Sequence, residues 1–84
     1  MMIGYQRSST SDQQAGYDAQ RRDLEAAGCT KFFGEMVSSV AERGQLNAAL
    51  AYLREGDTLV VTRLDRLARS VRNLMEIVDA INAK

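Results

Sequence analysis

The chain has 84 residues, 45% of them apolar, and its 11 basic residues balance 11 acidic ones. This length allows one small domain and excludes a second. With a single cysteine, Cys29, and no histidine, the chain cannot form an internal disulfide or the usual zinc ligand sets, and we expect a reducing, cytoplasmic setting. No apolar run is long enough for a membrane span, and the first residues lack a signal-peptide layout.

The first part of the chain predicts a strand followed by a helix. Residues 2–6 form a short apolar run, and the polar cluster at residues 7–12 follows it, as a loop follows a strand. Capping-box spacing then predicts a helix over about residues 12–27, which stops at Gly28. Cys29 comes directly after this helix and is most simply a small buried hydrophobic residue.

A second strand and a second helix follow. The aromatic run at residues 31–33 lies between two glycines and predicts a strand that closes at Glu35 or Met36, with a loop over about residues 37–42. An amphipathic helix comes next, because apolar side chains recur at the i, i+3, i+4, i+7 spacing and Gly56 stands where a glycine stop belongs. Its apolar positions are Leu46, Ala49, Leu50 and Leu53.

The last part of the chain predicts a third strand and a third helix. Residues 58–62 are rich in β-branched side chains and apolar on both faces, so we expect the innermost strand of a parallel sheet here. After a loop over residues 63–69, Ser70 is expected to cap a helix. The apolar stripe of that helix comprises Val71, Leu74, Val78 and Ile81.

Alternating strands and helices predict an α/β fold of three layers, with a small, mostly parallel sheet, right-handed crossovers and helices on both faces. Three short strands make a small sheet, and the last helix reaches Lys84 without a stop signal. We therefore expect the chain to be a truncated piece of a longer protein.

Two polar loops are the candidate site. Ligands bind at the carboxyl ends of strands in open α/β sheets, and the loops at residues 7–12 and 63–69 both leave such ends. We therefore expect them at the same edge of the sheet. They supply hydroxyl groups, from Ser8, Ser9 and Thr10, and guanidinium groups, from Arg7, Arg63, Arg66 and Arg69. Guanidinium groups hold phosphate oxygens through paired hydrogen bonds, which suits a phosphodiester substrate.

Simpler interpretations of these residues remain open at this point. A Ser/Thr cluster between a strand and a helix is usually a set of helix caps, and arginines three apart are often a solvated face. Asp57, Asp65 and Glu35 could gather a Mg²⁺ ion, although no D-x-D pair is present. The absence of a GxGxxG motif and of a P-loop argues against a nucleotide cofactor.

The stretch from Tyr5 to Gln13 resembles the Y-x-R-x-S-T-x-x-Q signature of the serine recombinases, the resolvase and invertase family. The similarity continues at Gln20 with residues 24–29, at residues 56–61 and at residues 64–70, in the family's order. It covers nearly the whole chain and implies a resolvase-like, flavodoxin-like topology. Gln6 and Ser8 depart from the small or aliphatic residues common in the signature, and residues 38–40 depart from a frequent Ser-Gly pair.

The resemblance assigns a role to each matching residue. Ser9 matches the nucleophile, whereas Ser8 stands where the family usually has valine. The other matching residues are catalytic Arg7, Arg43, Asp65, Arg66 and Arg69 and supporting Gln13, Gln20, Glu35 and Asp57. The residues expected to bind DNA are Arg7, Arg66, Arg69 and, from the same loop, Arg63.

The implied reaction is DNA cleavage and rejoining through a covalent link between Ser9 and the 5′ phosphate, without metal, ATP or any other cofactor. The implied partners are DNA and further copies of the full-length protein, as a dimer that becomes a tetramer in the synaptic complex, with no membrane. Two alternatives stay open on the residues alone: a non-enzymatic α/β interaction or regulatory module, and a Mg²⁺-dependent phosphotransfer enzyme.

Overall fold

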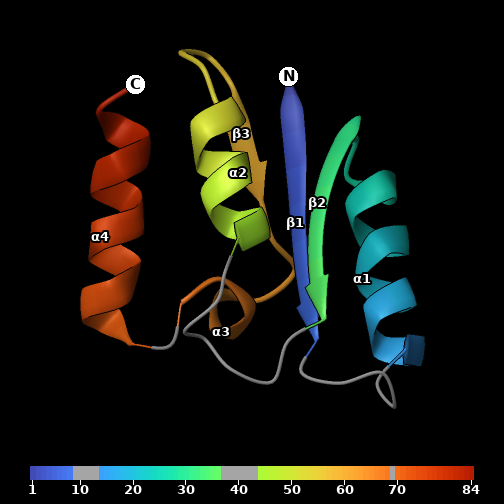
Figure 1. Cartoon of the computed structure of the whole chain (residues 1–84). Helices are drawn as coiled ribbons and strands as arrows, with labels where there is room; N and C mark the ends of the chain where they lie inside the picture. Colours follow the sequence, from blue (N-terminus) through green and yellow to red (C-terminus); the bar gives the residue numbers. More distant parts are fainter. Residues whose placement is uncertain (9–13, 37–43, 69) are drawn as a thin grey trace.

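The computed structural model describes residues 1–8, 14–36, 44–68 and 70–84, without the side chains of residues 36, 65 and 66. These residues form strands and helices in alternation, with one additional short helix after the third strand (Figure 1). In chain order the elements are β1 (Met2–Ser8), α1 (Gln14–Ala26), β2 (Lys31–Met36), α2 (Gly44–Tyr52), β3 (Thr58–Val60), α3 (Leu64–Leu67) and α4 (Val71–Asn82).

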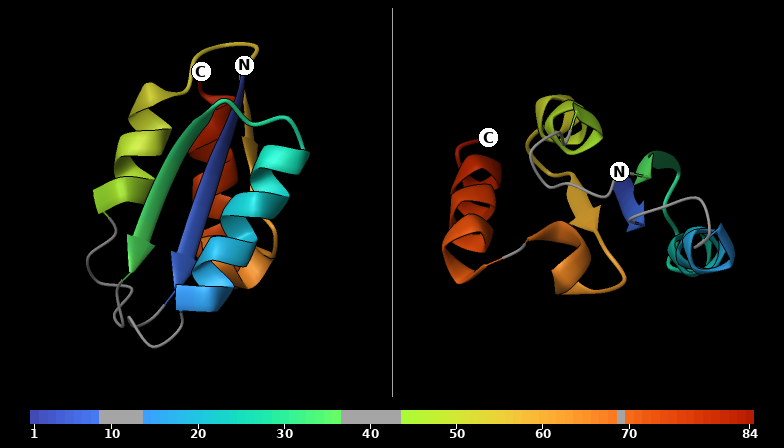
Figure 2. Two further views of the ribbon diagram at one scale, coloured as in Figure 1. Left: turned by 90° about the vertical axis from the view of Figure 1, so that its right-hand side faces the viewer. Right: turned by 60° about the horizontal axis from the view of Figure 1, so that its bottom comes forward.

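The three described strands form a parallel sheet in the order β2-β1-β3. β1 pairs with β2 from Ile3↔Lys31 to Ser8↔Met36, and with β3 from Met2↔Thr58 to Gly4↔Val60. Because β2 and β3 lie on opposite sides of β1, the two right-handed crossovers place α1 and α2 on opposite faces of the sheet (Figure 2). The expected α/β fold of three layers is confirmed, and the strand order is that of a flavodoxin-like sheet.

The expectation that residues 58–62 form the innermost strand is wrong. β1 is the central strand, and β3 pairs only with β1 among the described strands and ends at Val60. An apolar, β-branched run indicates that both faces of a strand are covered, but it carries no information on the order of strands across a sheet. That order is set by the direction of each crossover, which reverses between α1 and α2.

Side chains of β1 alternate between the two faces, as the pleat of a strand requires. Gly4 and Ser8 face α1, because a Cβ at Gly4 would contact Leu24 and the Ser8 hydroxyl bonds to Gln20. Tyr5 faces α2 and lies in the main buried cluster. That cluster draws on β1, α2, α4 and the segment around α3, through Tyr5, Leu46, Leu67, Ala68 and Ile77.

The helices follow their predicted caps with two differences. Gly28 ends α1 with φ of 101°, and Ser70 caps α4 by accepting a hydrogen bond from Asn73 N at 3.1 Å. Gly56, however, serves the turn before β3, because α2 already ends at Tyr52. On α4, Val71 is 78% exposed and Ile77 is buried, so the apolar stripe begins one turn later than predicted.

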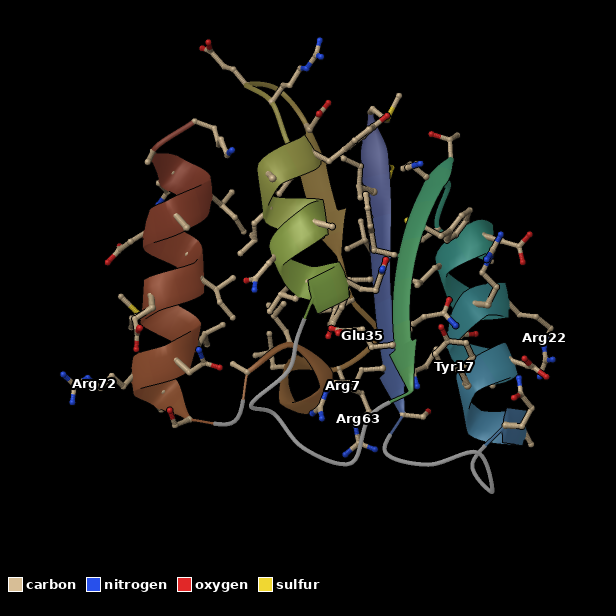
Figure 3. All side chains as sticks on the ribbon, in the orientation of Figure 1. Arg7, Tyr17, Arg22, Glu35, Arg63 and Arg72 are labelled. Carbon is tan, nitrogen blue, oxygen red and sulfur yellow. The ribbon has the colours of Figure 1, made fainter. Side chains whose placement is uncertain are left out.

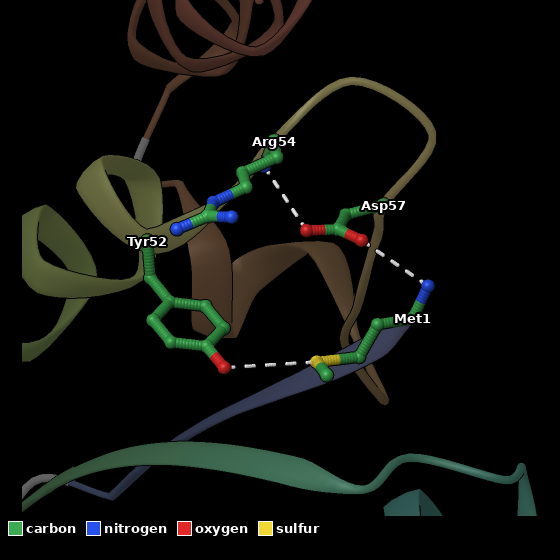
Figure 4. Close-up of polar contacts among 4 residues, drawn as sticks. All are labelled: Met1, Tyr52, Arg54 and Asp57. Carbon is green, nitrogen blue, oxygen red and sulfur yellow. Dashed lines mark hydrogen bonds and ion pairs between the residues drawn. The ribbon is translucent and has the colours of Figure 1, made fainter.

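Asp57 lies at the amino edge of the sheet, where β1 and β3 begin (Figure 4). Its Oδ1 is 3.1 Å from the amino group of Met1, and its Oδ2 accepts a hydrogen bond from Arg54 N at 3.0 Å. The Arg54 N–H and the terminal ammonium group hold the pKa of Asp57 below its usual value. The carboxylate of Asp57 therefore closes a turn and fixes the start of β1.

One testable consequence concerns two glycines. A Cβ at Gly34 would lie 3.0 Å from Tyr17 Cζ and 3.1 Å from Gln6 Cγ and would overlap the Tyr17 hydroxyl, whereas a Cβ at Gly16 in α1 has open space. We expect Gly34→Ala to lower the free energy of unfolding by about 1 to 3 kcal/mol, because Tyr17 must move. Gly16→Ala should raise it by up to about 1 kcal/mol, because alanine favours the helix. Urea unfolding of the chain measures both, and equal effects would contradict the packing of α1 described above.

A second consequence concerns pH. Since the pKa of Asp57 is lower in the folded than in the unfolded chain, its stabilisation is present above the ordinary aspartate pKa and is lost as the pH falls through the folded value. Asp57→Asn should therefore destabilise the chain most near neutral pH, with a difference from the wild type that shrinks toward pH 3. Urea unfolding across this range tests it, and a difference independent of pH would show that the carboxylate charge is unimportant.

Candidate active site

The carboxyl edge of the sheet brings together the described parts of the two loops that the sequence singles out, residues 7–8 and 63–68. β1 ends at Ser8, and α3 follows the end of β3. Arg7 and Arg63 lie at this same edge, whereas Arg72 on α4 and Arg22 on α1 lie on the flanks of the molecule (Figure 3). For the described residues the predicted juxtaposition is confirmed, because parallel strands place their carboxyl ends at one edge. The ends of β1 and β3 also bracket the point where the strand order reverses, the usual ligand position in such sheets.

Gln20 of α1 binds the backbone at the end of β1. Its Oε1 accepts a hydrogen bond from Arg7 N at 3.1 Å, and its Nε2 donates to Arg7 O at 2.9 Å. The same Nε2 lies 3.3 Å from Ser8 Oγ. Gln20 is only 8% exposed, so its amide would be costly to leave unpaired.

Ser8 is a buried structural residue. Its side chain is 1% exposed and its hydroxyl accepts the hydrogen bond from Gln20 Nε2. A nucleophile must reach its substrate, and Ser8 faces α1 from within the sheet. The structure therefore agrees with the preference for another hydroxyl of the 7–12 cluster.

Two further residues, Gln6 and Tyr17, connect β1 to α1. Gln6 Nε2 donates to Tyr17 O at 3.1 Å, while Gln6 Oε1 is buried and has no hydrogen-bond partner among the described residues. Burial is the main cause that raises the pKa of Tyr17. Sequence patterns assigned no role to this contact. The alternation of polar residues along β1, at Gln6 and Ser8, could have predicted that the face of β1 toward α1 is polar.

Glu35, predicted as a supporting residue, connects β1, β2 and α2. The carboxylate is 6% exposed and accepts hydrogen bonds from Tyr5 Oη at 2.6 Å, Gln45 N at 3.2 Å and Leu46 N at 3.2 Å. The two backbone donors belong to the first turn of α2, where N–H groups lack partners within the helix. Glu35 therefore fixes the place where α2 begins, directly after residue 43.

Asp57 does not lie in the site, which corrects the expectation that it supports the reaction. A residue that precedes a strand lies at the amino edge of a parallel sheet, and Arg7 lies at the carboxyl edge. The same placement separates Asp57 from Glu35, which is paired with Arg7 in the register of β1 and β2. These two acids cannot share a Mg²⁺ ion, and the described residues contain no group of three or more potential metal ligands.

Several predicted site residues cannot be placed in full. Asp65 and Arg66 lie in α3 by their backbone, at the carboxyl edge, and their side chains are outside the description. Ser9, Gln13, Arg43 and Arg69 lie outside the described residues. None of the helices in the described ranges has the length and apolar character that crossing a membrane requires.

Comparisons with known proteins agree with this architecture. The family model for the resolvase N-terminal domain matches residues 2–84. DNA-invertase hin of Salmonella typhimurium is 45% identical over 83 residues, which are 98% of this chain and 43% of that protein. Serine recombinase gin of Escherichia phage Mu is 44% identical over 85 residues, covering 100% of this chain and 43% of that protein. The chain thus spans less than half the length of these relatives.

A solved structure supports the fold independently. The C-terminal catalytic domain of ISC1926 TnpA, an IS607-like serine recombinase, superposes with a TM-score of 0.74 at 23% sequence identity, covering 95% of this chain and 64% of that one. With the family match over residues 2–84 and the signature at the carboxyl end of β1, the chain belongs to the resolvase N-terminal domain family of the serine recombinases.

Proposed function

We propose that this chain is the front part of the catalytic domain of a site-specific DNA recombinase and that Ser9 is its nucleophile. The observation that carries the proposal is the arrangement at the carboxyl edge, where the signature residue Arg7 lies next to the last residue of β1 and Arg63 leads into α3. Membership of the family supports the reaction class. Burial of Ser8 supports Ser9 as the hydroxyl that meets DNA.

In the proposed reaction the Ser9 oxygen attacks a phosphorus atom of the DNA backbone. A bond between Ser9 Oγ and phosphorus forms, the bond from phosphorus to the 3′ oxygen breaks, and the 3′ oxygen leaves with a proton as a free hydroxyl. The serine proton passes to a local base or to water, with Asp65 as our candidate. Because the phosphoester bond is exchanged rather than hydrolysed, its energy is kept for rejoining by the reverse reaction.

Positive charge for the transition state comes, in this proposal, from arginine. Arg7, Arg43, Arg66 and Arg69 would hold the phosphoryl oxygens through charge-assisted hydrogen bonds, and Arg63 would contact the neighbouring backbone. Such a site calls for no metal ion or cofactor. The full-length protein would act in the cytoplasm on two DNA duplexes, as a dimer that assembles into a tetramer.

The first test of function is a pair of serine variants. Residues 1–84 replace the matching segment of DNA-invertase hin, and the chimera is assayed on its recombination site. Ser9→Ala should abolish both cleavage and the covalent protein–DNA adduct on a denaturing gel, while DNA binding persists. Ser8→Ala should stay close to the wild-type rate. An adduct that survives Ser9→Ala, or a wild-type chimera that forms none, would contradict the proposal.

The second test concerns the arginines. Arg66→Ala and Arg69→Ala in the same chimera should each slow cleavage by at least about a hundredfold, the scale for loss of one transition-state donor. Arg72→Ala on α4 and Arg22→Ala on α1 are matched controls, since both side chains are exposed and lie on the flanks of the molecule. Single-turnover cleavage rates measure the effect. Equal losses at all four positions would point to a general charge effect instead of a phosphate site.

A further inference from the structure

Among the described strands none pairs with the end of β1 on its β3 side, and a side chain binds the backbone there. Thr58 N donates to Met1 O, whereas Thr30 N donates to Met2 O, so odd-numbered residues of β1 direct their backbone groups toward β3. The pairing with β3 stops at Gly4↔Val60. Arg7, further along the same edge, therefore extends beyond the end of β3. There the side-chain amide of Gln20 accepts a hydrogen bond from Arg7 N and donates one to Arg7 O.

A primary amide is well suited to this position because it offers one acceptor and one donor side by side, as a backbone peptide group does. Without it, the N–H and the C=O of Arg7 would each lose this hydrogen bond at a partly buried place. The carbonyl of Arg7 belongs to the planar peptide group that ends at Ser8 Cα. Ser9 is the next residue along the chain.

We propose that Gln20 is a positioning residue for the nucleophile: by pairing with both backbone groups of Arg7, it fixes the direction in which β1 delivers Ser9 to the phosphate. This inference rests on the proposed function, because it assigns Gln20 a role only if Ser9 is the attacking group. Gln20 itself touches no substrate in this account. Its effect passes through the peptide between Arg7 and Ser8 and through the Arg7 side chain, which the same backbone carries.

The neighbouring residues show why α1 can supply this contact. Leu24, one helical turn after Gln20, packs against Gly4, where a Cβ would lie 3.0 Å from Leu24 Cδ1. Arg21 stacks on the ring of Phe32 in β2 with 3.7 Å between its Cζ and the ring centroid. These contacts anchor α1 against the sheet without Gln20. Loss of the Gln20 amide should therefore disturb the end of β1 more than the docking of the helix.

The test uses Gln20→Glu in the same chimera. A carboxylate still accepts from Arg7 N but faces Arg7 O with a second acceptor, whereas a protonated carboxylic acid restores the donor. At pH 8 the cleavage rate of Gln20→Glu should be at least about tenfold below that of the wild type, because a reacting group is misplaced. As the pH is lowered, the rate should recover toward that of the wild type measured at the same pH. The loss should lie in the single-turnover cleavage rate, with DNA affinity unchanged.

Three companion variants make the result specific. Gln20→Met has similar length and no hydrogen-bonding amide, so it should lose cleavage at every pH without recovery. Ser8→Val removes only the 3.3 Å contact with Gln20 Nε2 and should cleave like the wild type. Leu24 lies on the same face of α1 as Gln20, and Leu24→Val should lower the melting temperature. It should leave the cleavage rate of the folded protein unchanged.

The outcomes separate this inference from the function on which it rests. If Gln20→Glu and Gln20→Met both cleave at the wild-type rate while Ser9→Ala is inactive, the positioning role is refuted and the recombinase function stands. A second outcome is that the cleavage rates of the Gln20 variants and of Leu24→Val all fall in proportion to the loss in melting temperature. In that case Gln20 is merely structural and the inference is overturned. If Ser9→Ala retains the adduct, it is the proposed function that fails.

Discussion

Hydrogen bonding along both edges of β1 is the constraint on which the rest of the site depends. One edge pairs with β2 as far as Ser8, and the other passes from β3 to the Gln20 amide at Arg7. Because both edges are hydrogen-bonded, the backbone of β1 has little freedom at its last residues, Arg7 and Ser8. The backbone at Arg7 and Ser8 is therefore held in place, as the nucleophile role that we propose for Ser9 requires.

The layer between β1 and α1 combines this constraint with a cost in stability. Gln6, Ser8 and Gln20 are all buried there, and Gln6 Oε1 has no partner among the described residues. A buried unpaired acceptor costs about 1 to 3 kcal/mol, a large fraction of what a domain of this size can spare. On the other face, Glu35 performs the comparable task of fixing the start of α2 with a fully engaged carboxylate. Polar contacts thus act beside the apolar packing in holding the elements that border the site.

Sequence patterns predicted most of the fold and only part of the site. Periodicity and caps located every main element, since Gly28 and Ser70 have local roles that their neighbours define. The innermost strand was mispredicted because residues 58–62 record how a strand is covered and not which strand lies beside it. Asp57 was assigned to the site through a motif match, although its place before β3 puts it at the opposite edge. The contact between Gln20 and Arg7 joins residues 13 apart, and no local pattern indicates which backbone group a buried amide will meet.

The most direct test of the account is to find the atom that carries the DNA. After covalent trapping with the chimera and nuclease digestion, trypsin releases the peptide of residues 8–21, because Arg7 and Arg21 flank it. This peptide contains Ser8, Ser9, Thr10 and Ser11, and fragmentation by mass spectrometry distinguishes them. The account predicts the residual nucleotide on Ser9 alone. A nucleotide on Ser8, Thr10 or Ser11, or trapping that leaves this peptide unmodified, would contradict it.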